Sequence, residues 1–109
     1  MLKGIDSRLS ADVLYTLKAM GHGDVLILAD ANFPSDSIGA ETVTGQTLTM
    51  HNLSSAEAAE AVLSVLPLDT FVDDFAGRME IVGAPDEIPP VQAEVQTVID
   101  TAEGTPRPM

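Results

Sequence analysis

The sequence contains no cysteine and no tryptophan, and aromatic residues make up only 4% of it. Without cysteine, the chain has no disulfide, no thiolate nucleophile and no cysteine-ligated zinc site. With so few aromatic rings, the core has to be assembled mainly from Leu, Val, Ile, Ala and Met side chains. These absences exclude disulfide scaffolds and every enzyme class that depends on a cysteine.

Basic residues are also scarce. Five Lys and Arg residues stand against 17 Asp and Glu residues, which gives a formal net charge of −12. Affinity for nucleic acids and for anionic membranes comes mainly from Lys and Arg. We therefore expect neither as a partner. A neutral small molecule or another protein suits this surface better, and the acidic charge is otherwise explained by solubility.

No hydrophobic run is long. The longest purely aliphatic stretch is "VLILA", residues 25–29, whereas a membrane-spanning helix needs about 20 apolar residues. The opening "MLKGIDSRLS" lacks the pattern of a secretory signal. We expect a cytoplasmic protein, with the 109 residues forming a single domain over residues 1–109.

Three segments combine a helical spacing of apolar residues with start and stop signals. A serine or a proline marks each start, and a glycine or a proline marks each end. We predict helices within residues 8–23 (Ser10, Gly21), 53–66 (Ser54 with Glu57, ended by Pro67) and 89–104 (Pro90, Gly104). The apolar stripes expected to enter the core are Val13, Leu14, Leu17, Met20, Ala58, Ala61, Val62, Val65, Val91, Val95, Val98, Ile99 and Ala102.

The apolar run in "DVLILAD", residues 24–30, is unbroken and bounded by acids. Such a run is typical of a strand covered on both faces, as in parallel sheets. Shorter strands are predicted over "TLTM", residues 47–50, and "MEIV", residues 79–82, and a long loop over residues 31–46. Helices interleaved with strands predict an α/β layered fold with a mostly parallel central sheet flanked by helices.

His22 stands in "GHGD", between two glycines. Three interpretations remain open. The local sequence favours a polar residue on a surface turn after a helix. A general acid/base is the second, because histidine titrates near neutral pH and the glycines leave room for a substrate. The third is a metal ligand together with Asp24 and His51, although no HxxxH or HxH spacing supports it.

Asp30 ends the apolar run and precedes "ANFP". Ligand sites in open α/β sheets lie at such strand ends. Its carboxylate either accepts backbone N–H groups in an Asx-turn or accepts hydrogen bonds from sugar hydroxyls. Six extended residues at about 3.3 Å each separate it from His22 by roughly 20–25 Å. One site in one subunit then uses both residues only if the backbone folds back or a neighbouring subunit contributes.

The remaining charged residues suggest structural roles. Asp73 and Asp74 are interpreted as a solvated turn, and Arg78 as an ion-pair partner of the many carboxylates. "GHGD" has no GxGxxG or GxxxxGK continuation, so a phosphate-binding glycine loop is not predicted.

The opening "MLKGID…LS…VL…L..MGHGD", running into "ADANFP", closely resembles the fucose mutarotase and ribose pyranase family of sugar-anomer isomerases. "GAPDEIPPVQAEV" continues the likeness more loosely. "GHGD" with "DANFP" is similar to the fucose branch, since the ribose branch tends to carry Thr after the histidine and a "DAGLP"-like stretch. The resemblance implies an α/β protein without a cofactor that interconverts the anomers of L-fucose or a related monosaccharide. It also implies a homo-oligomer, from dimer to decamer, with sites near subunit contacts.

The resemblance further implies that His22 is the catalytic acid/base and that Asp30 binds the substrate, with no metal and no nicotinamide. Members of the family usually continue for some tens of residues. This implies that a C-terminal strand region of the family's domain lies outside this chain. Arg107, in "TPRPM", does not match the family's sugar-contacting arginine. The alternative is a non-catalytic monosaccharide-binding or assembly module of the same family.

Overall fold

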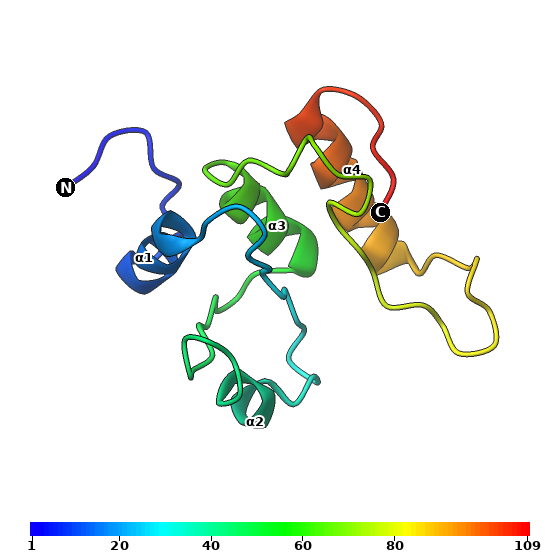
Figure 1. Cartoon of the computed structure of the whole chain (residues 1–109), viewed down its shortest axis with the longest axis horizontal. Helices are drawn as coiled ribbons and strands as arrows, with labels where there is room; N and C mark the ends of the chain where they lie inside the picture. The colour runs from blue at the N-terminus through cyan, green and yellow to red at the C-terminus, as the bar shows by residue number, and fades with distance from the viewer.

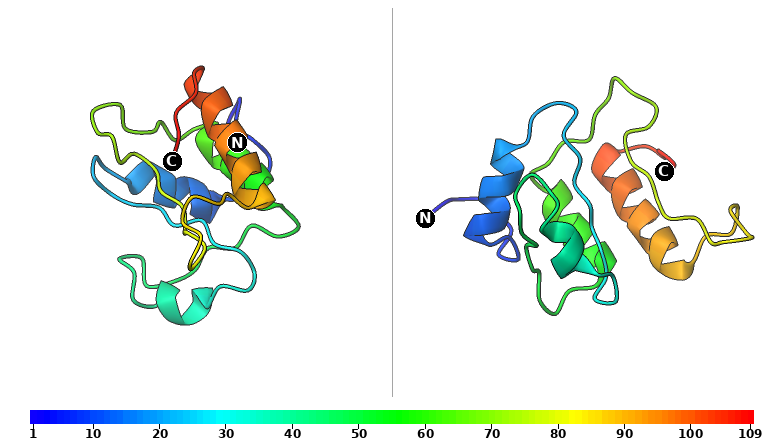
Figure 2. Two further views of the ribbon diagram at one scale, coloured as in Figure 1. Left: turned by 90° about the vertical axis from the view of Figure 1, so that its right-hand side faces the viewer. Right: turned by 60° about the horizontal axis from the view of Figure 1, so that its bottom comes forward.

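A computed structural model describes residues 1–109. The chain forms four helices joined by extended and irregular segments (Figure 1). The helices are α1 (Ala11–Ala19), α2 (Ser35–Gly39), α3 (Ser55–Leu63) and α4 (Pro90–Glu103). In Figure 1 α3 lies between α1 and α4, while α2 stands apart from the other three. The right view of Figure 2 again shows α3 between α1 and α4. None of the helices is long and apolar enough to cross a lipid bilayer.

The predicted start signals are confirmed at α1 and α3. The Ser10 side chain accepts the backbone N–H of Val13 at 3.2 Å. Ser54 and Glu57 form the predicted capping box, with bonds of 2.9 and 3.1 Å. Because the Glu57 carboxylate accepts the backbone N–H of Ser54, the pKa of Glu57 is lowered. These bonds satisfy amide groups that the first turn of a helix leaves without partners.

The end signals give a mixed result. Pro90 opens α4, and Gly104 closes it in the left-handed region at φ 74°, as predicted. At α1 the prediction is wrong: Met20 is the C-cap, in extended backbone, and Gly21 is not left-handed. The left-handed glycine of this turn is Gly23, at φ 89°.

The core is small and lies between α1 and α3. Five buried side chains form its main cluster: Leu9, Val13, Leu17, Ala61 and Val62. Ala58, Ala59 and the α4 residue Ile99 are also buried, whereas the predicted core residues Val65, Val91 and Ala102 are exposed. Burying a Val or Leu side chain contributes about 1.5–3 kcal/mol, so this cluster and the close packing of α4 on α3 both stabilise the fold.

Arg8 ties the segment before α1 to α3. Its guanidinium lies 2.7 Å from Asp6 and 2.8 Å from Glu60. The hydrogen bonds from Arg8 lower the pKa of Asp6 to about 2. These contacts place α1 and the segments around it against the middle helix.

The predicted central parallel sheet is absent, which corrects the expected fold class. Residues 24–30 are extended but pair with no strand, and the predicted strands over residues 47–50 and 79–82 do not form. The single isolated bridge joins Ile81 to Ala84 within a tight turn. The aliphatic run is apolar enough for a buried strand, but a strand also needs a neighbour for its N–H and C=O groups. No backbone hydrogen bond joins residues 25–29 to another segment, and all five are exposed.

The predicted loop contains a helix that the sequence did not reveal. α2 follows Pro34 and ends at the buried Gly39. Thr47 closes over it by donating a hydrogen bond to the carbonyl of Ser35. A Cβ added to Gly39 would clash with Thr47 Oγ1 and would lie 3.0 Å from the Thr47 backbone nitrogen, so only glycine permits this close approach.

Candidate functional site

His22 lies on the tight turn that follows α1. Asp24 Oδ2 accepts the backbone N–H of Gly21 at 2.7 Å and closes the turn. A Cβ at Gly23 would meet nothing within 4 Å, so this glycine serves the left-handed backbone rather than the space around it. The turn leaves the His22 side chain 71% exposed.

The His22 ring faces two side chains from a distant part of the sequence. Its Nε2 lies 3.4 Å from Asp69 Oδ2. Its ring meets the Phe71 ring edge to face, with 6.1 Å between centroids. The Asp69 side chain is only 23% exposed, so its carboxylate is partly sheltered between His22 and the body of the protein. A carboxylate on one imidazole nitrogen orients the ring and selects the nitrogen that carries the proton.

Asp69 is a candidate site residue that the sequence did not reveal. It follows Pro67 after the end of α3, in "PLDTF", and no spacing rule connects this stretch with "GHGD". Its Oδ1 accepts the backbone N–H of Phe71 at 2.8 Å, which fixes the carboxylate. Only the folded chain brings the two stretches together.

Asp30 occupies a self-contained turn. Its Oδ1 accepts the backbone N–H groups of Asn32 and Phe33 at 2.9 and 3.0 Å. This is the predicted Asx-turn geometry. Oδ2 takes part in neither bond, and Asp30 is exposed, so one carboxylate oxygen remains free to accept a hydrogen bond from a ligand.

The structure does not bring His22 and Asp30 together. They stand at opposite ends of the extended residues 24–30, which run from the end of α1 towards α2 (Figure 2). His22 Nε2 faces the Asp69 carboxylate, and the hydrogen bonds of Asp30 stay within its own turn. A site that uses both residues therefore has to span the separation of roughly 20–25 Å that the sequence predicts.

The other candidates take no part in this arrangement. His51 is exposed on its own turn, and no group of three His, Asp or Glu side chains is placed to hold a metal ion. Asp73 and Asp74 are exposed, in agreement with a solvated turn. Arg78 does not pair with a carboxylate as predicted. It donates instead to the backbone carbonyls of Pro85 and Glu87, at 2.9 and 3.4 Å, and to the Gln92 side chain at 3.2 Å.

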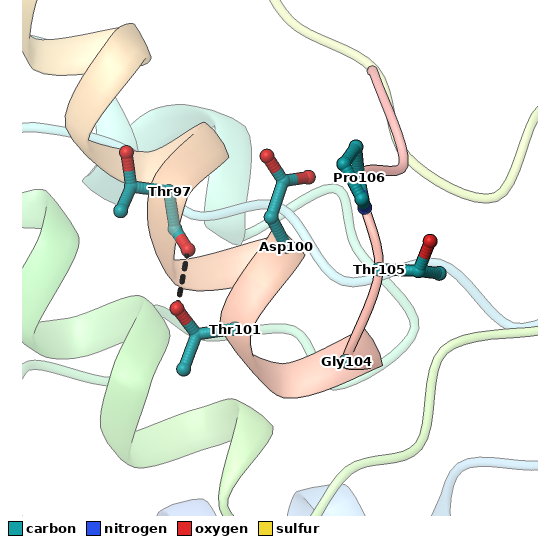
Figure 3. A pocket seen from close by; sticks show the side chains of 6 residues that line it. All are labelled: Thr97, Asp100, Thr101, Gly104, Thr105 and Pro106. Atoms are coloured by element: carbon teal, nitrogen blue, oxygen red, sulfur yellow. Dashed lines mark hydrogen bonds between the residues drawn. The ribbon is translucent and has the colours of Figure 1, made fainter.

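An open hollow of about 350 Å³ lies at the end of α4 (Figure 3). Three of its four polar side chains already have partners in the protein, those of Thr97, Asp100 and Thr101. Thr101 donates to the carbonyl of Thr97 at 2.9 Å, and Asp100 accepts from the Gln96 side chain and from the backbone of Arg107, both at 2.8 Å. Neither His22 nor Asp30 lines this hollow, so we do not take it as the functional site.

The chain is similar in sequence to a known family and to several known proteins. The model of the RbsD / FucU transport protein family matches residues 3–108. The fucose mutarotase of Bos taurus is 40% identical over 94% of this chain and 67% of its own length. That of Homo sapiens is 39% identical over 93% and 66%. The L-fucose mutarotase of Haemophilus influenzae (strain PittGG) is 34% identical over 95% and 69%. The chain thus spans about two thirds of the length of these relatives.

A solved structure agrees with the arrangement of the helices. It is the crystal structure of protein Atu2016, for which sugar binding is the suggested role. This chain is 56% identical to it, with a TM-score of 0.96 over 100% of this chain and 72% of the other. The backbone described above is therefore the one that the matching part of the longer relative adopts. By the family model that covers residues 3–108, the chain belongs to the RbsD / FucU transport protein family.

Proposed function

We propose that the protein is a mutarotase that interconverts the α and β anomers of L-fucose or a closely related monosaccharide. One observation carries the proposal. The exposed His22 is paired with the Asp69 carboxylate, in a chain that is 34–40% identical to proteins named fucose mutarotase. Those names favour an isomerase over the alternative of a non-catalytic sugar-binding module.

Mutarotation needs only proton transfers. One proton is added to the ring oxygen and one is removed from the anomeric hydroxyl, while the bond between the anomeric carbon and the ring oxygen breaks. The anomeric carbon becomes a carbonyl, rotates, and the ring closes on its other face. A histidine suits these transfers because it gains and loses a proton near neutral pH. In our proposal His22 is the catalytic acid/base.

Asp69 supports this role from behind the ring. Its Oδ2 lies 3.4 Å from Nε2 and favours one orientation of the imidazole, and the His22 side chain is exposed enough for a sugar to approach. Phe71 flanks the same ring, edge to face. Proton transfer then occurs at a nitrogen whose direction the fold has already set.

Asp30 is proposed to bind the sugar. Its Oδ1 is committed to the turn, which fixes the direction of Oδ2. A fixed carboxylate oxygen accepts hydrogen bonds from sugar hydroxyls and positions the ring. Because His22 and Asp30 stand at opposite ends of residues 24–30, we place the complete site where two copies of the chain meet.

A homo-oligomer in the cytoplasm belongs to the same proposal. Large apolar side chains lie exposed near His22 and along the extended segment, including Val25 at 83%, Ile27 at 66% and Phe71 at 87%. A second copy of the chain would cover such a surface. Sedimentation velocity tests this assembly, and a monomer at micromolar concentration would contradict it.

Two-dimensional exchange NMR of L-fucose tests the activity directly. Cross-peaks between the α and β anomeric protons are recorded with the protein and in buffer alone, and the same pair of spectra is taken with D-ribose. We expect faster exchange with L-fucose in the presence of protein. Exchange equal to buffer refutes the proposed activity. If L-fucose at the same time shifts the amide resonances of the protein, the binding-module alternative replaces it.

A further inference from the structure

Arg107 connects the segment after α4 to the residues that face His22. We call residues 69–75 the 69–75 loop. Arg107 Nη2 donates to the backbone carbonyls of Asp69 and Val72, the latter at 3.3 Å. Its guanidinium lies over the Phe75 ring, 3.6 Å from the ring centroid. One side chain thus contacts the loop at its beginning, its middle and its end.

The Arg107 guanidinium is also anchored to the last residue of α4. Arg107 Nη1 lies 3.3 Å from Glu103 Oε2, and the two side chains are only 19% and 16% exposed. The Arg107 backbone N–H donates to Asp100 at 2.8 Å. A charge pair this sheltered from water is screened less than a pair on the surface. The 69–75 loop is therefore anchored to a helix.

Asp69 is in contact with both Arg107 and His22. Its carbonyl accepts from Arg107, and its carboxylate faces His22. The loop forms no helix or strand of its own, so it has no regular backbone ladder to hold it. In Figure 1 the C-terminal segment, in red, runs beside this yellow-green loop. The Phe71 N–H fixes the carboxylate locally, and the guanidinium adds a tertiary contact to the Asp69 backbone that carries it.

We propose that Arg107 is a positioning residue of the mutarotase site: by holding the 69–75 loop it keeps the Asp69 carboxylate against His22. The inference rests on the proposed function for its effect on turnover, whereas its structural half is independent of any activity. Arg107 does not touch the sugar in this proposal. Its effect falls on the orientation of the imidazole and thus on kcat.

The chemistry of arginine suits this task. A planar guanidinium offers several N–H donors in fixed directions and also stacks on an aromatic ring. Lysine keeps the positive charge beside Glu103, but a single ammonium group cannot serve two carbonyls and lie flat on Phe75 at once. Arg107→Lys is therefore expected to fold and to hold the loop only in part.

Arg78 provides a matched control. It also donates through its guanidinium to two backbone carbonyls, those of Pro85 and Glu87. The segment that it holds, residues 79–87, contains neither the His22 partner nor the ring beside it. Arg78→Ala removes a comparable clamp without changing the surroundings of His22.

The experiment compares Arg107→Ala, Arg107→Lys and Arg78→Ala in the full chain. Exchange NMR at several L-fucose concentrations separates kcat from KM. The nuclear Overhauser effect between the His22 and Phe71 rings, and hydrogen exchange of the amides of the 69–75 loop, report its position without any sugar. For Arg107→Ala we expect kcat to fall on the order of ten-fold or more with little change in KM. We also expect the ring contact to be lost and the loop amides to exchange faster.

Arg107→Lys is expected to give a smaller change in the same direction, and it carries the test if the alanine variant does not fold. Arg78→Ala is expected to leave kcat and the ring contact as in the wild type. A wild-type kcat together with an intact ring contact in both Arg107 variants overturns the proposal. So does an equal loss in Arg78→Ala. If the wild type itself shows no exchange above buffer, the proposed function fails, while the ring contact and hydrogen exchange still decide whether Arg107 positions the loop.

Discussion

Two turns, one at each end of the extended residues 24–30, carry the candidate chemistry, and they are built differently. The turn at His22 reaches across the fold to Asp69 and Phe71. The turn at Asp30 closes on its own backbone through Asn32 and Phe33. The proposed proton-transfer group thus depends on tertiary structure, whereas the proposed sugar-binding group depends only on its neighbours in sequence. Substitutions at the His22 turn should therefore involve residues distant in the sequence, whereas substitutions at the Asp30 turn should affect only its neighbours.

The largest expected effect comes from removing the imidazole. His22→Gln keeps a polar side chain on the turn but cannot transfer protons near neutral pH. We expect L-fucose exchange to slow by about 10²–10⁴-fold, the usual contribution of general acid–base catalysis. Exchange NMR measures the rate, with the exposed His51→Gln as the control. Equal rates for the two variants would remove His22 from the mechanism.

Next comes the distant partner of the same turn. Asp69→Asn keeps an oxygen that can accept the Phe71 N–H but loses the negative charge beside His22. We expect kcat to fall on the order of ten-fold, with KM little changed. Asp73→Asn, in the same loop but exposed, is the control and should behave as the wild type. A change in KM alone would assign Asp69 to sugar binding instead.

At the other turn the expected effect lies in KM. Asp30→Asn keeps a carbonyl oxygen for the Asx-turn, so the local backbone should persist. Its amide replaces the free acceptor oxygen with a donor, and we expect KM for L-fucose to rise on the order of ten-fold. Asp30→Ala also removes the turn bonds and should be worse. If both variants bind L-fucose as the wild type does, the turn serves the backbone only.

Substitutions away from both turns should change stability and leave exchange intact. Ser54→Ala removes half of the capping box of α3 and should lower the free energy of unfolding by about 1 kcal/mol. Urea denaturation followed by circular dichroism measures it. A loss of kcat in the folded Ser54→Ala protein would show that the site depends on this helix end more than its geometry suggests.

The smallest expected effect is that of mild acid. The pKa of Asp6 is lowered from 3.8 to about 2, and that of Glu57 is lowered as well. Because these pKa values are depressed in the folded protein, their contribution to stability is complete above the ordinary carboxyl range and is lost as pH falls towards 2. Urea midpoints from pH 5 to pH 3 should fall less steeply in Asp6→Asn than in the wild type. Parallel slopes would contradict a role for Asp6.

Features that depend on contacts within a few residues were predicted from the sequence, whereas features that depend on distant contacts were not. Helix starts at Ser10, Ser54 and Pro90 follow from bonds or geometry within a few residues, and they are confirmed. The Asx-turn at Asp30, one of two interpretations, is also local. The contact of Asp69 with His22 joins stretches that no spacing rule connects, so the sequence could not reveal it.

The predicted sheet failed for a related physical reason. Composition and aliphatic character made residues 25–29 suitable for a strand, but a sheet also requires a partner segment that offers its own backbone groups. In this chain the two expected partners do not extend alongside, and the aliphatic side chains remain exposed. Helix α2 was missed because its glycine and proline signals also fit a loop. Local patterns predicted which segments were apolar, but not which other segments they would pack against or pair with.

Mixing two impaired variants tests most directly whether the two separated turns act in one site. His22→Gln and Asp30→Ala chains are co-expressed, and L-fucose exchange is measured at a sugar concentration well below KM. If each site takes His22 from one copy and Asp30 from another, random assembly restores both residues in about a quarter of the sites. We therefore predict exchange well above the average of the two variants measured alone. Exchange equal to that average would contradict a site shared between copies.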